Sequence, residues 1–454
     1  MILKQFKTPG LAHFSYLIGA GEDAAVIDPQ LDLEQYLTAA QEEGVVIRHI
    51  FETHRNEDFV TGAKKLAETT GAKVWHGPNS AGDIAYAETV GEGAEVEIGQ
   101  LKLKTLLTPG HTDDSISIAI YDSEYPEGAV GVFTGDALFI GDVGRTDFYQ
   151  GQEEEKAGLL FDSLQKLLSL GDQAILYPAH GAGSVCGSGM AAREFSTIGH
   201  ERANSPRLQL AREDFIKTKA GEHHYQPPYF ELMERLNLQG GHDVISPAQL
   251  LMLSLSTLKE ASPDVVLDVR DPTSHLGGHV SGSLCLPVGM IAAFGGWFLK
   301  EDTRIGLVAE SADHARNATR HLCRIGFANI VGAVTGVLGM ASGGADTDFI
   351  ATADTGAMAS RVNQSPENWI LLDVRSKEEF ESGHVEGASH AYVGEVLEKP
   401  ENYVSDKGIT VMCGSGARAS LAASALKAAG QKGVDVYVGS IGAWQSAGKP
   451  VVTE

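Results

Sequence analysis

Thr53-His54-Arg55-Asn56-Glu57-Asp58-Phe59 directly follows an apolar run at residues 45–51, and this stretch decides the fold predicted for the first half of the chain. The apolar run predicts a buried strand that ends in a polar loop. Three later segments repeat the arrangement: residues 101–107 precede Pro109-Gly110-His111-Thr112, residues 129–133 precede Thr134-Gly135-Asp136, and residues 174–177 precede Pro178-Ala179-His180. Imidazole and carboxylate groups on loops at one sheet edge can converge on a metal ion, so the four strand ends predict a metal site.

The size and charge of the chain limit its organisation and its partners. Its 454 residues exceed one domain, and its net charge of −25 disfavours nucleic acid and anionic membrane surfaces as partners. No apolar run approaches the roughly 20 residues of a membrane span, and the N-terminal residues show no signal-peptide pattern. The four widely spaced cysteines suit a reducing compartment. A cytoplasmic protein that binds neither nucleic acid nor membranes is therefore expected.

The second half of the chain repeats itself. Asp268-Val269-Arg270 recurs 105 positions later as Asp373-Val374-Arg375, and Gly278-His279-Val280 recurs at the same offset as Gly383-His384-Val385. The repeat predicts two copies of one domain, at about 245–345 and 350–454, after a first domain at 1–240. A charged, helical stretch at 203–226 and a linker near 227–241 are expected to close the first domain. Strands alternate with helical segments in each copy, which predicts α/β units with parallel sheets.

The four polar clusters resemble those of the metallo-β-lactamase superfamily, which implies an αββα sandwich. The first cluster of that family is Thr-His-x-His-x-Asp-His, so Asn56 and Phe59 stand where two histidine ligands belong. The remaining ligands His54, His111 and Asp136 form the set of two imidazoles and one carboxylate that is typical of non-haem Fe(II) oxygenases. The resemblance to persulfide dioxygenases of this superfamily implies one iron on these three residues. Asp58 and His180 then belong to an unused second site, where they support the ligands by hydrogen bonds at most.

Other interpretations of the first domain stay open. The loss of two motif histidines also fits a domain that has lost its catalytic function and binds no metal. Arg145, in Gly144-Arg145-Thr146-Asp147, matches the arginine that contacts the substrate carboxylate in persulfide dioxygenases, but an internal salt bridge is an equal alternative.

Residues 370–454 resemble a rhodanese domain. Asp373-Val374-Arg375, Glu379-Phe380 and the segment 383–388 carry its signature, and Cys413 follows a predicted strand at 408–412. The loop Gly414-Ser415-Gly416-Ala417 can surround a sulfur atom with N–H groups, and the following helix and Arg418 add positive charge. These features predict a sulfur-transferring thiolate at Cys413 with Arg418 beside it, and a substrate loop at Gly414, Ser415, Gly416 and Ala417. The alternative is an inert core thiol.

The first repeat copy has no cysteine at the corresponding position, where Glu310 and Asp313 would repel a thiolate. It is expected to be an inactive scaffold. Nearly the whole chain resembles persulfide dioxygenase–rhodanese fusions. The resemblance implies one Fe(II) per chain rather than zinc, a persulfide of glutathione or coenzyme A, O2, sulfite and thiosulfate as small-molecule partners, and a homo-oligomer. The alternatives are a zinc-dependent, glyoxalase-II-like thioester hydrolase and a metal-free platform that carries a rhodanese sulfurtransferase.

Overall fold

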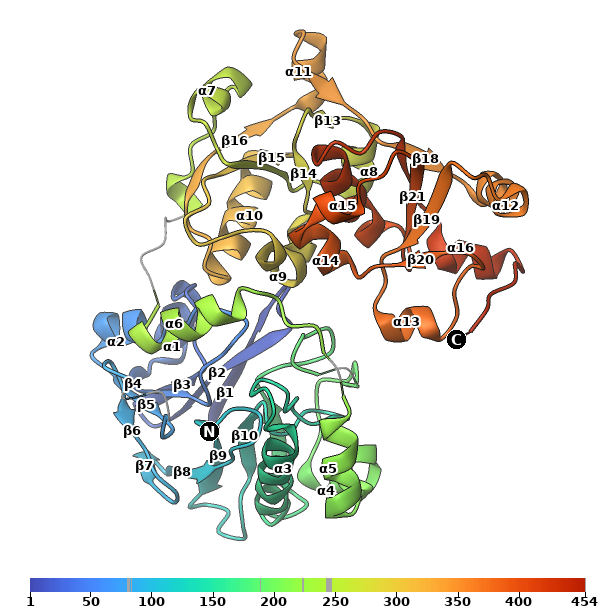
Figure 1. Ribbon diagram of the computed structural model, residues 1–454. Coiled ribbons are helices and arrows are strands. Elements are labelled where there is room, and N and C mark those ends of the chain that lie inside the picture. Colours follow the sequence, from blue (N-terminus) through green and yellow to red (C-terminus); the bar gives the residue numbers. More distant parts are fainter. Residues whose placement is uncertain (80–81, 83, 188, 223, 242–246, 454) are drawn as a thin grey trace. The chain divides into compact units, whose positions relative to one another are not determined.

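The computed structural model describes residues 1–79, 82, 84–187, 189–222, 224–241 and 247–453 (Figure 1). Residues 245 and 454, where two of the expected domains begin or end, lie outside the described residues. The chain forms two compact units. One comprises residues 1–226, 230–243 and 324–326, and the other comprises residues 227–229, 244–323 and 327–454.

The first unit contains two sheets. One has the order β1-β2-β3-β4-β5-β6, with β1 (Ile2–Thr8), β2 (His13–Ala20), β3 (Asp23–Ile27), β4 (Val46–Glu52), β5 (Lys73–His76) and β6 (Glu88–Thr89). The other has the order β11-β10-β9-β8-β7, with β7 (Glu95–Ile98), β8 (Leu101–Leu107), β9 (Ile116–Asp122), β10 (Gly131–Gly135) and β11 (Ile175–Pro178). The four strands expected at residues 45–51, 101–107, 129–133 and 174–177 are thus present as β4, β8, β10 and β11.

The side chains of these strands alternate between two cores, as the strand period of two residues requires. In β3, Ala25 and Ile27 face a cluster that also holds Ile118 and Ile120 of the other sheet, so this core lies between the sheets. Ala24 and Val26 face the helices α1 (Glu34–Glu43) and α2 (Ala63–Thr70) on the opposite side. The outer face of the second sheet packs against α3 (Glu153–Leu168) and against Phe215 of α5 (Arg212–Ala220). The layer order is helix, sheet, sheet, helix, which confirms the expected αββα sandwich.

The C-terminal part of this unit is helical. α4 (Ile198–Asn204) and α5 lie in or next to the stretch expected to be helical. The segment expected to be a linker contains α6 (Phe230–Gln239), in which Phe230, Met233 and Leu236 are buried. Their spacing of three residues places them on one face of a helix, so one face of this short helix is buried.

The second unit contains the two repeat copies. The first copy has the sheet order β14-β12-β15-β16, with β12 (Val265–Asp268), β14 (Leu284–Cys285), β15 (Ile305–Ala309) and β16 (Ile330–Thr335). The second has the order β18-β22-β21-β19-β20, with β18 (Ala351–Ala353), β19 (Trp369–Asp373), β20 (Ser389–His390), β21 (Gly408–Met412) and β22 (Val434–Tyr437). All neighbours in both sheets are parallel. The small strands β13 (His279–Val280) and β17 (Thr347–Asp348) pair separately.

The helices of the two copies follow the same order as their strands. The first copy contains α7 (Leu255–Glu260), α8 (Pro272–Gly277), α9 (Ile291–Phe294), α10 (Ala312–Arg324) and α11 (Val337–Ser342). The second contains α12 (Thr355–Gln364), α13 (Lys377–Glu381), α14 (Val393–Glu398), α15 (Ala417–Ala428) and α16 (Ser440–Ser446).

The repeated Asp-Val-Arg motif makes the same contacts in both copies. Arg270 donates hydrogen bonds to Asp268 at 2.6 Å and to the Gly278 carbonyl at 2.8 Å. Arg375 donates to Asp373 at 2.7 Å and to the carbonyl of Gly383 at 2.9 Å. In both copies the motif therefore joins the end of the central strand to the following loop.

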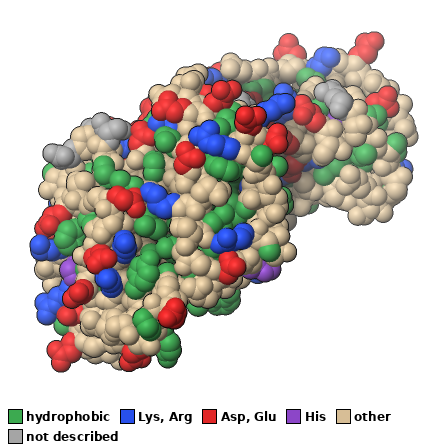
Figure 2. Space-filling view, turned by 90° about the horizontal axis from the view of Figure 1, so that it is seen from below, with side chains coloured by type: hydrophobic (Ala, Val, Ile, Leu, Met, Phe, Trp, Pro, Cys, Tyr) green, Lys and Arg blue, Asp and Glu red, His purple; other side chains and the backbone are tan. Residues whose placement is uncertain are grey.

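The surface and the cysteines fit the composition. Figure 2 shows acidic side chains interspersed with basic ones over the face in view. Among the described residues, no helix is both long and apolar enough to cross a membrane. All four cysteines are buried and free.

Candidate metal centre and cysteine loop

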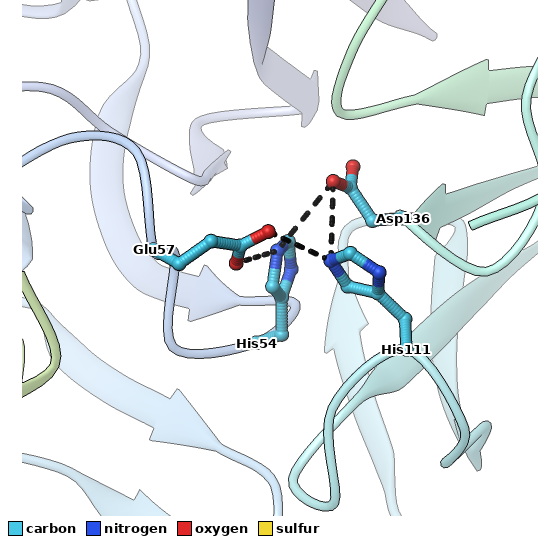
Figure 3. A group of neighbouring side chains, drawn as sticks. All are labelled: His54, Glu57, His111 and Asp136. Atoms are coloured by element: carbon cyan, nitrogen blue, oxygen red, sulfur yellow. Dashed lines mark hydrogen bonds and ion pairs between the residues drawn. The ribbon is translucent and has the colours of Figure 1, made fainter. Parts of the chain in front are cut away.

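The loops that follow β4, β8 and β10 bring His54, Glu57, His111 and Asp136 together (Figure 3). All four side chains are buried. Gly110 allows the loop before His111 to approach α3, because a Cβ on Gly110 would lie 2.4 Å from the Leu160 backbone nitrogen. The three ligands expected from the sequence thus converge on one buried point.

The distances suit the ligands of a single ion. His111 Nε2 lies 3.1 Å from Glu57 Oε1 and 3.5 Å from Asp136 Oδ2, and His54 Nε2 lies 3.8 Å from Asp136 Oδ2. Metal–ligand bonds of about 2.1 Å place neighbouring ligand atoms about 3.0–3.4 Å apart. His54 Nε2 and Glu57 Oε2 are buried without a hydrogen-bond partner, which is costly unless an ion satisfies them. The residues therefore fit a bound metal.

Hydrogen bonds behind the histidines orient both rings. Thr53 donates its hydroxyl hydrogen to Asp28 at 2.8 Å, so its oxygen accepts a hydrogen bond from Nδ1 of His54 at 2.9 Å. His111 Nδ1 donates to the Arg145 carbonyl at 3.0 Å. Each ring therefore carries its proton on Nδ1 and presents the Nε2 lone pair to the site. Such partners commonly hold metal-binding histidines in place.

Glu57 is a site residue that the sequence analysis missed. It occupies an unspecified position of the family motif, but its carboxylate oxygens lie 3.8 Å from His54 Nε2 and 3.1 Å from His111 Nε2 (Figure 3). Burial opposes its ionisation, yet when His111 is protonated its charge and its Nε2–H hydrogen bond lower the pKa of Glu57 to about 2. The available signal was a carboxylate between two motif histidine positions that have both been lost.

Asp58 and His180 lie behind Asp136. His180 Nδ1 lies 2.8 and 2.9 Å from the two Asp136 oxygens, and its Nε2 lies 3.1 Å from Asp58 Oδ2. Burial opposes ionisation of Asp136, but the imidazoles of His180, His54 and His111 hold its pKa below the ordinary value. His180 thus orients a predicted metal ligand.

The two departures from the family motif do not contribute imidazoles. Asn56 turns its amide to the His54 carbonyl at 3.3 Å, and Phe59 packs on the ring of His13 with centroids 4.2 Å apart. Cys186, which the sequence analysis gave no role, is fully buried and groups with Asp58 and His180.

Arg145 is buried, and its guanidinium is engaged within the fold. It donates to both carboxylate oxygens of Asp147, at 2.6 and 2.8 Å, and to the carbonyls of Val185 and His224 at 3.3 Å. The internal salt bridge that the sequence analysis held open is therefore the arrangement in the structure.

Cys413 lies at the end of β21 and begins the loop Gly414-Ser415-Gly416-Ala417 before α15. The N–H of Gly416 donates to Cys413 Sγ at 3.1 Å, and Ser440 Oγ accepts from the Cys413 backbone N–H at 3.0 Å. Ser415 is exposed, so this loop reaches the surface. The N-terminus of α15 adds a partial positive charge that stabilises a thiolate or persulfide.

Arg418 lies against the loop, but its positive charge is paired with the carboxylate of Glu379. Its Nη1 and Nη2 donate to the Glu379 carboxylate at 2.6 and 2.8 Å. A Cβ added to Gly414 would lie 3.3 Å from Arg418 Nη2, so the guanidinium tip is next to the backbone that follows Cys413. Glu379 therefore holds Arg418 beside the loop and offsets part of the positive field expected there.

We expect Gly416→Ala to destabilise the second repeat copy by about 1–3 kcal/mol, since it forces a side chain into a left-handed backbone conformation. Gly416 has φ +99°, and its Cβ would lie 2.4 Å from the Val438 carbonyl oxygen. Urea denaturation of the full chain measures the loss. Gly414→Ala is the matched control, because φ at Gly414 lies outside that region and only a flexible side-chain tip is close. Equal stability of the two variants would contradict the strain argument.

Comparisons with known proteins match both halves of the chain. The model of the metallo-beta-lactamase superfamily matches residues 8–180, and that of the rhodanese-like domain matches residues 358–447. The mitochondrial persulfide dioxygenase ETHE1 of Mus musculus is 28% identical over 248 residues, which are 53% of this chain and 89% of the relative. A hydroxyacylglutathione hydrolase of Rhodospirillum rubrum is 35% identical over 160 residues, 34% of this chain and 56% of the relative.

A solved structure extends the likeness beyond the first unit. The crystal structure of a metallo-beta-lactamase from Staphylococcus aureus has a TM-score of 0.67 and 30% identity, and the match covers 74% of this chain and 99% of that one. The match spans nearly the whole of the relative at this identity and agrees with the two sheets and the strand-end ligands. The chain therefore belongs to the metallo-β-lactamase superfamily and carries a rhodanese-like domain at its C-terminal end.

Proposed function

We propose that the first unit is an iron-dependent dioxygenase that converts a low-molecular-weight thiol persulfide and O2 to sulfite and the free thiol, and that Cys413 transfers sulfane sulfur. The balanced reaction takes RSSH, O2 and water to RSH, sulfite and two protons. Glutathione and coenzyme A are candidate thiols. The persulfide dioxygenase relative supports the reaction, and the rhodanese-like domain supports the sulfur transfer.

The observation that carries this proposal is the convergence of His54, His111 and Asp136 without the two motif imidazoles. Two histidines and one carboxylate on one side of an ion leave positions open for substrate and O2. A dinuclear zinc hydrolase needs imidazoles at the positions of Asn56 and Phe59 to hold a bridging hydroxide. The donor set therefore favours the oxygenase.

The protein residues hold and orient the reactants. A bound Fe(II) supplies the activation of O2 and a coordination position for the terminal sulfur. The Thr53 and Arg145 contacts keep both rings aimed at the site, and His180 fixes Asp136. Glu57 reaches the same point and is a fourth candidate ligand.

The second reaction uses Cys413. A persulfide on Cys413 passes its outer sulfur to sulfite, which breaks the S–S bond of the enzyme, forms thiosulfate and returns the Cys413 thiolate. The reverse direction loads Cys413 from thiosulfate. The Gly416 N–H contacts the sulfur that carries charge in both directions.

Metal analysis combined with oxygen consumption tests the proposal. We expect the purified full chain to contain iron close to one equivalent and to consume O2 when glutathione persulfide is added. Zinc in place of iron, together with thioester hydrolysis that needs no O2, would establish the hydrolase that the Rhodospirillum rubrum relative suggests. A chain without stoichiometric metal, and with sulfur transfer alone, would establish the platform interpretation.

A further inference from the structure

The loop between β4 and α2 carries His54 and Glu57, but it has no regular structure to hold them in place. Residues 53–62, all of which the structure describes, belong to no helix or strand, and all of them are buried. Buried backbone N–H and C=O groups need hydrogen-bond partners, and a loop of this kind must find them in other parts of the fold. The direction of the two candidate ligands therefore depends on what this loop contacts.

Asn237 of α6 supplies three of these partners with one side chain. Its Nδ2 donates to the Asn56 carbonyl at 2.6 Å and to the Phe59 carbonyl at 2.9 Å. Its Oδ1 accepts a hydrogen bond from the Thr61 N–H at 2.9 Å. The side chain thus uses both of its donor hydrogens and its acceptor oxygen on one loop. Asn237 is only 2% exposed, so bulk water does not compete for these bonds.

The two carbonyls that Asn237 binds lie on either side of Glu57. The Asn56 carbonyl belongs to the peptide group directly before Glu57, and the other carbonyl belongs to the residue two positions after it. Bonds at both places restrict rotation of the backbone around Glu57. Its carboxylate oxygens lie 3.1 Å from His111 Nε2 and 3.8 Å from His54 Nε2, in the group drawn in Figure 3. Asn237 is therefore placed to set the direction of this carboxylate.

Helix α6 is itself held against the loop. Met233 and Asn237, four positions apart, are buried on one face of the helix. The Tyr86 hydroxyl donates to the Asn237 backbone carbonyl at 2.9 Å. Glu234 accepts a hydrogen bond from Arg55 Nη2 at 2.6 Å, and Arg55 is the residue that follows the candidate ligand of the loop. These contacts give the amide of Asn237 a fixed support.

We propose that Asn237 is a positioning residue of the metal centre. Its three hydrogen bonds hold the loop after β4 so that the Glu57 carboxylate reaches the centre and serves there as a ligand. Without them, two buried carbonyls and one buried N–H lack partners, and the loop must move to satisfy them. The inference rests on the metal centre of the proposed function, but it does not depend on which reaction that centre performs.

Cobalt titration of the metal-stripped full chain tests the inference, because the ligand-field absorption of Co²⁺ reports the ligands of its site. His111→Ala identifies the absorption that belongs to this centre. We expect Asn237→Leu, which has the same branched shape but makes no hydrogen bonds, to weaken Co²⁺ binding there by about 10–100-fold and to change the absorption. Glu57→Gln should also weaken binding by at least about tenfold. In the Glu57→Gln background, Asn237→Leu should add less than about threefold, because changes that act through one ligand are not additive.

Met233→Ala is the matched control, because Met233 is an equally buried residue of the same helix whose side chain has no N–H or O–H group. It should lower the midpoint of urea unfolding by removing buried volume, but it should leave the affinity and absorption of Co²⁺ unchanged with or without Glu57→Gln. Asn237→Ala replaces Asn237→Leu if that variant fails to fold, with the same expected loss of affinity.

Parent-like Co²⁺ binding by the Asn237 variant, or equal losses with and without Glu57→Gln, would overturn the positioning role. Unchanged binding by Glu57→Gln, or a parent that binds no Co²⁺ at this centre, would overturn it as well. The proposed function fails separately. A parent that shows the expected Co²⁺ results, but consumes no O2 with glutathione persulfide after loading with iron, would remove the dioxygenase and leave the role of Asn237 intact.

Discussion

His111→Ala is expected to remove iron from the full chain and to lower persulfide-dependent oxygen consumption by at least about 100-fold, since even residues that only support metal ligands cost 10–100-fold. The His111 ring is fully buried, and its Nε2 lies 3.1 Å from Glu57 Oε1 and 3.5 Å from Asp136 Oδ2. Sulfur transfer from thiosulfate to cyanide should be unchanged, because it uses Cys413. Elemental analysis and an oxygen electrode measure the first two effects.

His200→Ala is the control for this variant. His200 is an exposed histidine on α4, outside the candidate metal centre, so its removal should change neither iron content nor oxygen consumption. Full oxygen consumption by His111→Ala would show that the group of His54, His111 and Asp136 is not the site of the reaction, and the dioxygenase proposal would fail.

Cys413→Ser should lower thiosulfate:cyanide sulfur transfer by at least about 10³-fold, because loss of a catalytic nucleophile commonly costs this much or more. The serine hydroxyl can occupy the place of Sγ beside the Gly416 N–H, but it cannot carry a sulfane sulfur. Oxygen consumption with added persulfide should remain. The two assays on one preparation measure both effects.

Cys285→Ser serves as the control, because Cys285 occupies a strand of the first repeat copy rather than a loop before a helix. It should retain sulfur transfer. Loss of both activities in Cys413→Ser, in a protein that still folds, would contradict two separate sites. Retained sulfur transfer would assign that reaction to another thiol.

Local sequence patterns predicted much of the fold. The strands β4, β8, β10 and β11 were expected because each is a short apolar run that ends in a polar loop, and runs of this length favour buried strands over helices. The repeat could be recognised from the sequence because the Asp268–Arg270 contact joins residues only two positions apart. The same two residue types recur together at Asp373 and Arg375. Pro227-Pro228 and Gly240-Gly241 indicated a helical linker at the end of the first domain, and the short helix α6 between them is stabilised by burying Phe230 and Met233.

The sequence by itself determined which residue types stand at the strand ends: His54, His111 and Asp136 in the first unit, and Cys413 with its loop in the last. These assignments follow from the motifs and from their order along the chain, and both are properties of the sequence. Only the tertiary structure decided that Glu57 enters the first group, that Arg145 is paired with Asp147 and Arg418 with Glu379, and that Cys186 joins Asp58 and His180. The physical reason is that a buried carboxylate, guanidinium or thiol takes its role from whichever opposite charge or ligand the packed loops bring within reach. For Cys186 and Glu57 that neighbour lies 129 residues away along the chain.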